Sequence, residues 1–281
     1  MKGLRLISLA LLLVLAYSIR KQTKYNYFNY GCSYLPRADK VAKGGDDANY
    51  ESENLLAVAD GVGGWELVGV DPSAYSRKLV SGASELFKQS PQRYVSSPRT
   101  LMQDAWSQDL EKGSSTFLLV TLDEKTPNLH VAQVGDSGFA VFRNENGQWK
   151  TVYPYQSYQL KFNMPYQLAA NIVNGNDPSV AVERTLKVQN NDIIIMGTDG
   201  LFDNLFEGSM INILRDYAPN GILDNPQELA QVIANAAQRN SVDPTFDSPF
   251  AINARRAGLG DIGGGKPDDI TVVVAQIKVF Q

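Results

Sequence analysis

Four short apolar runs, each flanked by an aspartate, constrain the fold of this chain more than any other feature of its sequence. Leu-Leu-Ala-Val-Ala-Asp-Gly stands at 55–61 and Val-Ala-Gln-Val-Gly-Asp-Ser-Gly at 131–138. Ile-Ile-Ile-Met-Gly-Thr-Asp-Gly and Pro-Asp-Asp-Ile-Thr-Val-Val-Val follow at 193–200 and 267–274. Short runs rich in Val, Ile and Leu are typical of buried strands. The sequence therefore predicts a sheet whose strand ends carry carboxylates.

The aspartates at these strand ends are Asp60, Asp136, Asp199 and the pair Asp268 and Asp269. Several carboxylates at one sheet edge repel one another unless a cation lies between them. Oxygen ligands of this kind suit magnesium or manganese. The alternative for any single aspartate is a turn residue, because Asp-Gly pairs also mark turns. For Asp60 and Asp199 the metal role is favoured, since an unpaired carboxylate beside a buried strand is costly. For Asp136 both interpretations stay open.

Composition limits the classes of protein to which the chain can belong. Its 281 residues are 43% hydrophobic and 20% charged, as in an ordinary globular protein with one large domain. A net charge of −4 without a Lys/Arg run predicts no nucleic-acid partner. The lone cysteine, Cys32, excludes an internal disulfide, and the lone histidine, His130, excludes a multi-histidine zinc site.

The N-terminus differs from the rest of the chain. Lys2 and Arg5 precede a nearly unbroken apolar stretch at 6–19. This stretch is shorter than the roughly 20 residues of a membrane span and matches the apolar part of a signal peptide. We expect residues 1–24 to form a secretory leader or a membrane anchor, attached through residues 6–19. An organelle transit peptide is the alternative, and residues 25–281 form a single domain.

Periodicity predicts a mixture of helices and strands. Helices are expected at 71–88, with Asp71 as N-cap and Pro72 at the first helical position, and from 97–98 onward. Two more are expected at 208–217 and at 225–238, the last with Glu228 at a capping position. Runs at 115–122, 128–134 and 138–143 predict an antiparallel meander. The runs at 180–188 and 192–197 predict a strand pair, and residues 241–265 a loop. Strands followed by separate helices favour an α+β fold with a sheet core covered by helices.

A further acidic site, Gly44-Gly45-Asp46-Asp47-Ala48, precedes the others. In chain order the motifs are Gly-Asp-Asp-Ala, Ala-Asp-Gly-Val-Gly-Gly-Trp, Gly-Ser-Ser-Thr, Gly-Asp-Ser-Gly, Thr-Asp-Gly-Leu-Phe-Asp-Asn and Gly-Lys-Pro-Asp-Asp-Ile-Thr-Val. Each motif alone is weak, but six in order, spread over about residues 30 to 278, are specific. Together they resemble the metal-dependent Ser/Thr protein phosphatase 2C family (PPM type), most of all its mitochondrial branch.

The resemblance implies a central antiparallel β-sandwich flanked by helix layers (α-β-β-α) with a two-metal centre at one end. The implied metal ligands are Asp46, Asp60, Gly61 through its carbonyl, Asp199 and Asp268. Asp60 would bridge two magnesium or manganese ions, and Asp47 would orient the attacking water. Asp136 matches a position associated with a third, weaker metal site. Asp47, Asp60 and Asp136 form the implied catalytic set.

Two positions depart from the family pattern. Many members carry a histidine after the bridging Asp-Gly, as a proton donor to the leaving alcohol, where this chain has Val62. A phosphate-binding arginine usually lies four residues before the first acidic pair, where this chain has Ala42. Lys43, Lys40 or Arg37 could approach a phosphate instead, but a lysine offers a point charge rather than a bidentate fork.

The resulting hypothesis is a magnesium- or manganese-dependent Ser/Thr phosphoprotein phosphatase, monomeric, that uses direct attack of water without a covalent intermediate. One alternative is a pseudophosphatase that binds phosphoproteins with little turnover, and another is a hydrolase of small phosphate esters. The apolar leader indicates a secretory or membrane-anchored location, whereas the resemblance implies the mitochondrion. Asp203 and Asn204 are interpreted as helix-start residues, and Lys266 as a solvated loop residue.

Overall fold

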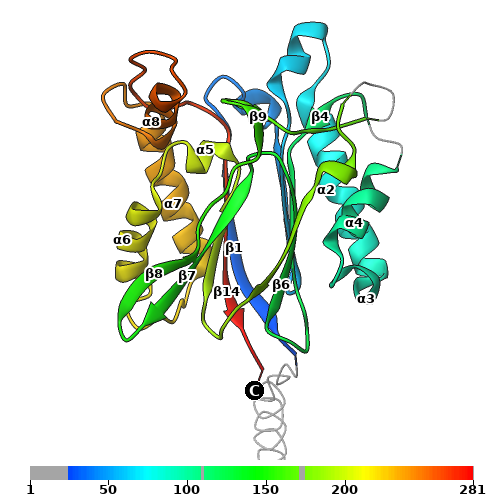
Figure 1. Ribbon diagram of the computed structural model, residues 1–281, viewed down its shortest axis with the longest axis vertical. Coiled ribbons are helices and arrows are strands. Elements are labelled where there is room, and N and C mark those ends of the chain that lie inside the picture. Colours follow the sequence, from blue (N-terminus) through cyan, green and yellow to red (C-terminus); the bar gives the residue numbers. More distant parts are fainter. Residues whose placement is uncertain (1–24, 109–110, 171–174, 281) are drawn as a thin grey trace, which may run out of the picture.

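The protein is described by a computed structural model for residues 25–108, 111–170 and 175–280. Two five-stranded antiparallel sheets face each other, and helices cover the outer face of each, so that four layers result (Figure 1). The order of sheet A is β1 (Tyr27–Leu35), β14 (Ile270–Lys278), β13 (Ile193–Gly197), β7 (Gly138–Glu145) and β8 (Gln148–Tyr153). The order of sheet B is β12 (Val182–Lys187), β6 (Asn128–Val134), β5 (Phe117–Leu122), β3 (Leu55–Asp60) and β2 (Asp47–Glu51). The predicted sandwich with helix layers is confirmed.

The central strands are apolar along their whole length because both of their faces are buried. In β3, Leu56 and Val58 face sheet A, whereas Leu55 and Ala57 face the helices outside sheet B. Successive side chains of a strand point to opposite faces, so such a strand contributes to two cores at once. A third core lies between sheet A and its own helices.

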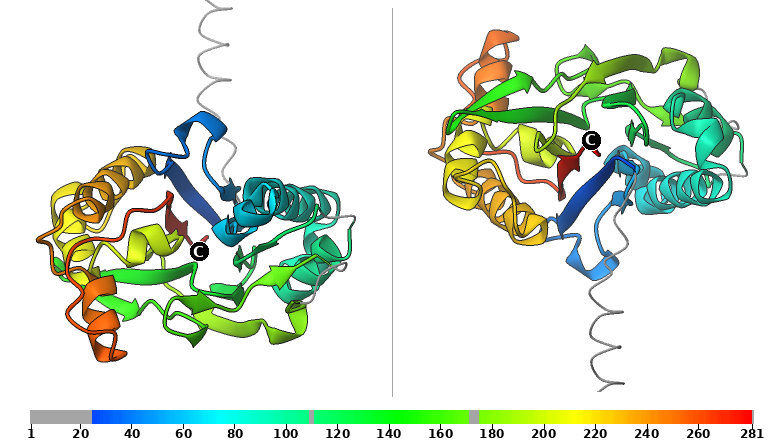
Figure 2. Two further views of the ribbon diagram at one scale, coloured as in Figure 1. Left: turned by 90° about the horizontal axis from the view of Figure 1, so that it is seen from above. Right: turned by 90° about the horizontal axis from the view of Figure 1, so that it is seen from below.

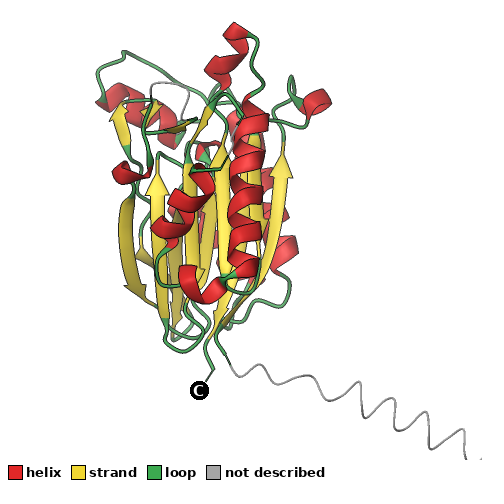
Figure 3. Ribbon diagram, turned by 90° about the vertical axis from the view of Figure 1, so that its right-hand side faces the viewer, coloured by secondary structure: helices red, strands yellow, loops and turns green. Residues whose placement is uncertain are grey.

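Most of the helices on the two sides begin at a proline, and a side-chain cap precedes some of them. Sheet B is covered by α2 (Pro72–Gln89), α3 (Pro91–Tyr94) and α4 (Pro98–Trp106), as Figure 3 shows from that side. Sheet A is covered by α5 (Asp199–Phe202), α6 (Glu207–Tyr217) and α7 (Pro226–Ser241), and α8 (Pro249–Arg256) follows. Asp71 accepts a hydrogen bond from the Ser73 amide, and Asn225 accepts one from the Glu228 amide. These caps are the ones that the sequence predicts.

Short elements connect the layers at the end of the sandwich seen from above in Figure 2 (left). They are η1 (Val41–Lys43), η2 (Gly63–Val68), β4 (Ser114–Ser115), β9 (Gln159–Lys161), β10 (Met164–Pro165), β11 (Leu168–Ala169) and η3 (Pro178–Val180). Strands β9 and β10 pair as a small hairpin, and β11 pairs with β4.

Two predicted strand pairings are wrong. Strand β6 lies in sheet B and β7 in sheet A, so 115–143 is not a meander. Likewise β12 pairs with β6 in sheet B, whereas β13 lies in sheet A. Both connections cross from one sheet to the facing one. An apolar pattern cannot show this, because strands buried on both faces look alike in either sheet. The predicted loop at 241–265 is also wrong in part, since it contains α8.

The predicted secretory or membrane-anchored location is corrected. No helix within residues 25–108, 111–170 and 175–280 is both long and apolar enough to cross a bilayer. A span needs about 20 apolar residues. The apolar stretch at 6–19, on which the expectation depended, lies outside the described residues.

Candidate functional site

A cleft of about 220 Å³ opens at one end of the sandwich, where β3 and β13 end and β14 begins. Four of the predicted aspartates line it: Asp60, Asp136, Asp199 and Asp268. Three basic side chains line it as well: Arg37, Lys40 and Lys266. The cleft therefore combines an acidic floor with cationic groups, which is the composition expected of a site for a metal-bound phosphate.

Strand register explains why residues so far apart in the sequence meet here. In sheet A, Gly197 pairs with Gly138 on one side and with Val272 on the other. The end of β13 therefore lies beside the beginnings of β7 and β14, which brings Asp199, Asp136 and Asp268 to one edge. In sheet B, Asp47 of β2 lies directly opposite Asp60 of β3. The antiparallel ladders gather the acidic residues of each sheet, and the packing of the two sheets brings both groups together.

Asp46 and Asp47 are buried and are not among the residues that line the cleft. The Asp46 carboxylate forms ion pairs with Lys40 and Lys43, each with an N–O distance of 2.7 Å. Oδ2 of Asp47 accepts hydrogen bonds from the hydroxyls of Thr198 (2.8 Å) and Thr271 (2.7 Å).

The two aspartates at the start of β14 differ in their surroundings. Asp268 lines the cleft, whereas Asp269 is buried and accepts hydrogen bonds from the backbone amides of Arg37 (2.7 Å) and Asp46 (2.8 Å). Asp269 thus fixes the loop that carries Asp46. Of the pair, Asp268 is the one whose carboxylate is available to a ligand, in agreement with the choice made from the sequence.

Lys266 and Asp203 belong to the site, contrary to the sequence interpretation. The Lys266 ammonium contacts Asp199, lies 2.8 Å from Asp203 and 3.6 Å from Asp268, and its side chain is only 16% exposed. Asp203 follows α5 instead of starting a helix. Asn204 holds the backbone of Lys266 through two hydrogen bonds of 2.8 Å. The Asp-Asn pair at 203–204 was the one sequence signal for this part of the site. Its partner Lys266 lies 62 residues away from Asn204 and could not be recognised from the sequence.

The site holds more negative charge than its basic residues balance. Burial, followed by the Asp199 carboxylate, raises the pKa of Asp136 to about 7 and that of Asp268 to about 6. The pKa of Asp60 lies well above its usual range because of burial and then of the carboxylates of Asp47, Asp199, Asp268 and Asp136. Crowded buried carboxylates that resist ionisation are what a divalent cation relieves.

Apart from the Asp46 oxygens, which meet lysine ammonium groups, three buried carboxylate oxygens have no hydrogen-bond partner among the described residues: Oδ1 of Asp47, Asp136 and Asp199. Such oxygens are costly unless a ligand binds them. Among the same residues, no three acidic, cysteine or histidine side chains are grouped so closely that they would hold one ion as they stand. Lysine ammonium groups occupy the space between the carboxylates instead. A metal ion held by Asp199 would compete with Lys266 for this carboxylate.

Gly61 shows how closely the backbone is packed at the floor of the site. A Cβ at this position would lie 2.7 Å from the Pro72 carbonyl oxygen and 2.8 Å from that of Asp46. The Gly61 amide donates to the Asp46 carbonyl (3.2 Å). Glycine is needed here because the start of α2 and the loop bearing Asp46 approach from both sides.

The two departures from the family pattern have different surroundings. Val62 lines the cleft and brings no proton donor to it. All three basic residues considered for the missing arginine are engaged by carboxylates: Arg37 by Asp39, Lys40 by Asp46 and Asp269, and Lys43 by Asp46 and Glu66. Of the three, Arg37 and Lys40 line the cleft.

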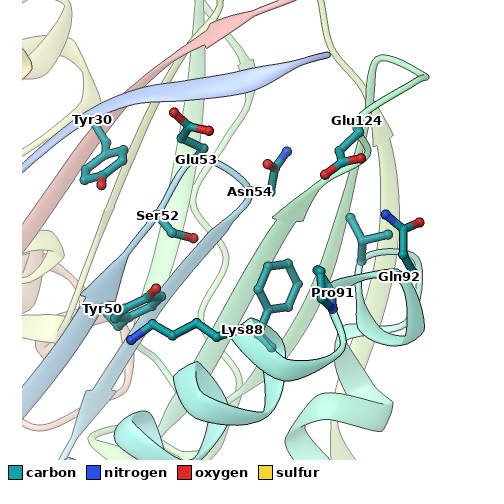
Figure 4. Close-up of a pocket in the computed structure, with 11 residues that line it drawn as sticks. Tyr30, Tyr50, Ser52, Glu53, Asn54, Lys88, Pro91, Gln92 and Glu124 are labelled. Carbon is teal, nitrogen blue, oxygen red and sulfur yellow. The ribbon is translucent and has the colours of Figure 1, made fainter. Parts of the chain in front are cut away.

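A second cavity, of about 350 Å³, lies at the opposite end of β3, around the turn that joins β2 and β3 (Figure 4). Tyr30, Tyr50 and Lys88 line it, and the Lys88 ammonium lies 4.9 Å from the centre of the Tyr50 ring. Its acidic residues, Glu53 and Glu124, are not joined by the clustered aspartates found in the cleft. The candidate functional site is therefore the carboxylate cleft, although this cavity is larger.

Sequence comparisons agree with the motifs. The family model "Stage II sporulation protein E (SpoIIE)" matches residues 51–278. A "Probable protein phosphatase 2C 80" of Arabidopsis thaliana is 38% identical over 250 residues, which are 88% of this chain and 58% of that protein. A "Protein phosphatase PTC7 homolog" of Homo sapiens is 36% identical over 277 residues, 91% of this chain and 88% of the relative. The chain thus spans little more than half of the Arabidopsis relative.

Solved structures share the fold. The photosystem II phosphatase PBCP has a TM-score of 0.80 and 32% identity, and the match covers 89% of this chain and 99% of that one. The catalytic domain of the serine/threonine phosphatase PstP, solved with two manganese ions, has a TM-score of 0.61 over 90% of this chain and 99% of that one. At 17% identity, the second match supports the fold alone.

Proposed function

Because this chain belongs to the protein phosphatase 2C family, we propose that it hydrolyses phosphoserine and phosphothreonine monoesters in proteins, with two divalent cations, magnesium or manganese, in the carboxylate cleft. The observation that carries the proposal is the convergence of four aspartates from both sheets on one cleft. Two of them, Asp136 and Asp199, keep a buried oxygen without a partner in the described part of the chain. Phosphoproteins as substrates follow from the names of the relatives.

We assign Asp46, Asp60, the Gly61 carbonyl, Asp199 and Asp268 to hold the two ions. These residues supply only oxygen ligands, which magnesium and manganese prefer. Bound there, the ions would neutralise phosphate charge and lower the pKa of the attacking water. Asp60 ends β3 of sheet B, whereas Asp199 follows β13 and Asp268 precedes β14, both strands of sheet A, so residues next to both sheets would hold the ions.

The chain's own residues would position the substrate and water around these ions. Arg37 and Lys40 line the cleft and would attract the phosphate. Thr198 and Thr271 hold one carboxylate oxygen of Asp47 and leave the other without a partner in the described chain. We assign that second oxygen to orient water. Val62 cannot donate a proton, so the leaving alcohol must take its proton from solvent or from another acid.

The test is phosphate release from a phosphothreonine peptide with manganese, with magnesium or with a chelator. We expect release that needs the metal and that falls roughly a hundredfold or more in Asp199→Asn, because one ligand loses its charge. Asp216→Asn, on the exposed face of α6, is the matched control and should leave the rate unchanged. Activity that survives the chelator would contradict the proposal.

One observation favours a second candidate function, a phosphoprotein-binding pseudophosphatase. Lysine ammonium groups already pair with Asp46 and with Asp199, so the fold can balance part of its acidic charge without metal. Titration calorimetry with manganese separates the two candidates. If the protein binds manganese but hydrolyses neither phosphopeptides nor small phosphate esters, the pseudophosphatase is favoured. If it hydrolyses small esters alone, a small-ester hydrolase is favoured.

A further inference from the structure

An apolar groove of about 420 Å³ adjoins the carboxylate cleft. Its walls are formed by Trp65 of η2 and by the β9–β10 hairpin through Leu160, Met164 and Pro165. Pro165 also lines the cleft, so the two depressions share a wall. A ligand seated in the cleft can therefore continue into the groove without leaving the surface of the protein.

Several polar groups in this groove are already engaged with one another. The Trp65 indole N–H donates to the Ser114 hydroxyl (2.6 Å), and that hydroxyl donates to the Gln167 side-chain oxygen. None of the described residues that line the groove is charged. A polar or charged occupant would find few free partners and would lose its hydration, whereas an apolar side chain would lose nothing.

Large apolar side chains nevertheless stand open to solvent here. Leu160 is 57% exposed and Met164 is 40% exposed, and both line the groove. On η2, the helix of Trp65, Leu67 is 91% exposed and Val68 is 64% exposed. Single exposed apolar residues are common, but a cluster beside a functional cleft marks a binding surface.

The hairpin that forms one wall is fixed to the cleft and to α8. The Gln159 side-chain amide donates to Oδ2 of Asp136 (2.8 Å), and Phe162 packs against Phe250 of α8 with ring centres 5.1 Å apart. The groove is therefore held at a set place relative to the aspartates. An occupant of the groove is positioned with respect to the reacting phosphate.

We propose that this groove binds an apolar side chain of the phosphoprotein substrate, within a few residues of the phosphoserine or phosphothreonine in the cleft. The occupant is an extended peptide segment because such a chain advances only about 3.3 Å per residue, so a neighbouring residue can reach over the shared wall at Pro165. The assignment depends on the phosphatase function proposed above and adds to it a substrate class: sites flanked by Leu, Ile, Met or Phe.

Phosphothreonine peptides on a serine-glycine background test this, with one leucine placed in turn at each of the four positions on either side. We expect one or two positions to raise kcat/KM roughly tenfold over the leucine-free peptide, the size expected for burying such a side chain. In the double variant Leu160→Ser, Met164→Ser, the KM of the leucine-containing peptide should rise to that of the leucine-free peptide, so that the gain in kcat/KM is lost. The double variant should leave hydrolysis of p-nitrophenyl phosphate unchanged, because this small ester does not reach the groove.

Ile222→Ser is the matched control, since Ile222 is 49% exposed and lies in the connection between α6 and α7. This variant should keep the leucine preference.

If kcat/KM is equal for all peptides while p-nitrophenyl phosphate is hydrolysed, the groove assignment is overturned but the phosphatase function is not. If neither peptide nor small ester is hydrolysed, the phosphatase function fails. In that case fluorescence anisotropy of labelled phosphopeptides tests whether the groove binds an apolar side chain. Equal affinities of wild type and the double variant for the leucine-containing peptide would overturn the groove assignment.

Discussion

At the scale of single residues, Lys266 is the basic group that contacts the most carboxylates of the cleft. Its ammonium pairs with Asp199 and Asp203 and approaches Asp268. These acidic neighbours raise its pKa well above the usual range, although burial acts in the opposite direction. Lys266 is thus a cation of the chain itself that would compete with a divalent ion for these carboxylates.

Replacing Lys266 by methionine should therefore weaken the metal-free fold and strengthen the response to metal. Removing one partner of a buried ion pair leaves uncompensated charge and costs about 3–5 kcal/mol at most. We expect a lower Tm for Lys266→Met in chelator, and a larger rise of Tm with manganese than in wild type. Differential scanning fluorimetry measures both.

Lys125→Met, at an exposed position, is the control for Lys266→Met and should behave as wild type in both conditions. An unchanged Tm in chelator would show that the ammonium of Lys266 does not stabilise the carboxylates. A smaller response to manganese than in wild type would mean that Lys266 assists the metal rather than competing with it.

Gly61 gives a second prediction at this scale. In Gly61→Ala the new methyl group would meet two carbonyl oxygens closer than 3 Å, those of Pro72 and Asp46. Either the start of α2 or the loop bearing Asp46 must shift. We expect a loss of stability of about 1–3 kcal/mol, typical of overpacking, together with weaker manganese binding. Gly63→Ala, with nothing within 4 Å of the added carbon, is the control. Equal denaturant midpoints for the two variants would contradict the expectation.

Sequence reasoning at the residue scale found the acidic residues but missed two of their neighbours. Asp60, Asp136, Asp199 and Asp268 adjoin buried strands, where a carboxylate is conspicuous, and all four line the cleft. Their roles as metal ligands remain a prediction. Asp203 and Lys266 stand in segments rich in turn residues, where a solvated role is the common outcome. Only the folded chain shows that the two pair.

At the scale of elements, helix α2 holds the loop that carries Asp46. One guanidinium nitrogen of Arg77 donates to the carbonyl oxygens of Gly44 and Gly45, both at 3.0 Å, and the Ser76 hydroxyl donates to that of Asp46 (2.6 Å). Gly44 and Gly45 have positive φ, so this loop is in a conformation that depends on such support. α2 therefore positions a candidate ligand without touching the cleft.

Arg77→Ala should raise the manganese concentration needed for half-maximal activity roughly tenfold, as expected when a group that orients a ligand is removed. Activity at saturating manganese should change little, because Arg77 does not line the cleft. A manganese titration of phosphate release checks this. Lys78→Ala, the next residue of α2, pairs only loosely with Glu111 (3.7 Å) and should titrate like wild type. A reduced maximal rate with unchanged manganese dependence would contradict the positioning role.

Elements were predicted better than their pairing. Helix starts were visible from caps such as Asp71-Pro72 and Asn225-Pro226, because capping is a local interaction. Strands were visible from composition. Their distribution between two sheets was not, since it depends on which faces meet across the core. Helix α8 was hidden because the glycines and prolines around it dominate the local signal.

At the scale of the whole molecule, the stability of the metal-free protein should fall as pH rises from about 4 to about 7. The folded pKa is about 7 for Asp136 and about 6 for Asp203 and Asp268, against an ordinary value of 3.8. Across this window the folded state binds more protons than the unfolded state, so ionisation favours unfolding. His130, whose pKa is lowered by burial, acts in the opposite direction near pH 6, but it is a single group.

Thermal unfolding in chelator between pH 4.5 and 8 measures this dependence. Saturating manganese should remove most of it and should raise Tm more at pH 7.5 than at pH 5, since the metal binds ionised carboxylates. A triple variant, Asp136→Asn, Asp203→Asn, Asp268→Asn, should weaken the dependence in chelator, and the raised pKa of Asp60 accounts for the part that remains. A stability in chelator that rises with pH over this window would show that the aspartates are not crowded in solution as they are in this fold.

The position of β14 has a consequence for synthesis of the protein. This strand, Ile270–Lys278, lies between β1 and β13 and pairs with both. Until β14 has left the ribosome, no strand connects β1 with β13. The edges of β1 and β13 that will pair with β14 therefore keep unpaired backbone hydrogen-bonding groups. Sheet B, by contrast, can pair fully once Lys187 has been translated. A nascent chain stalled before residue 270 would therefore carry one finished sheet and one split sheet with apolar strands exposed, a form that chaperones must protect from aggregation.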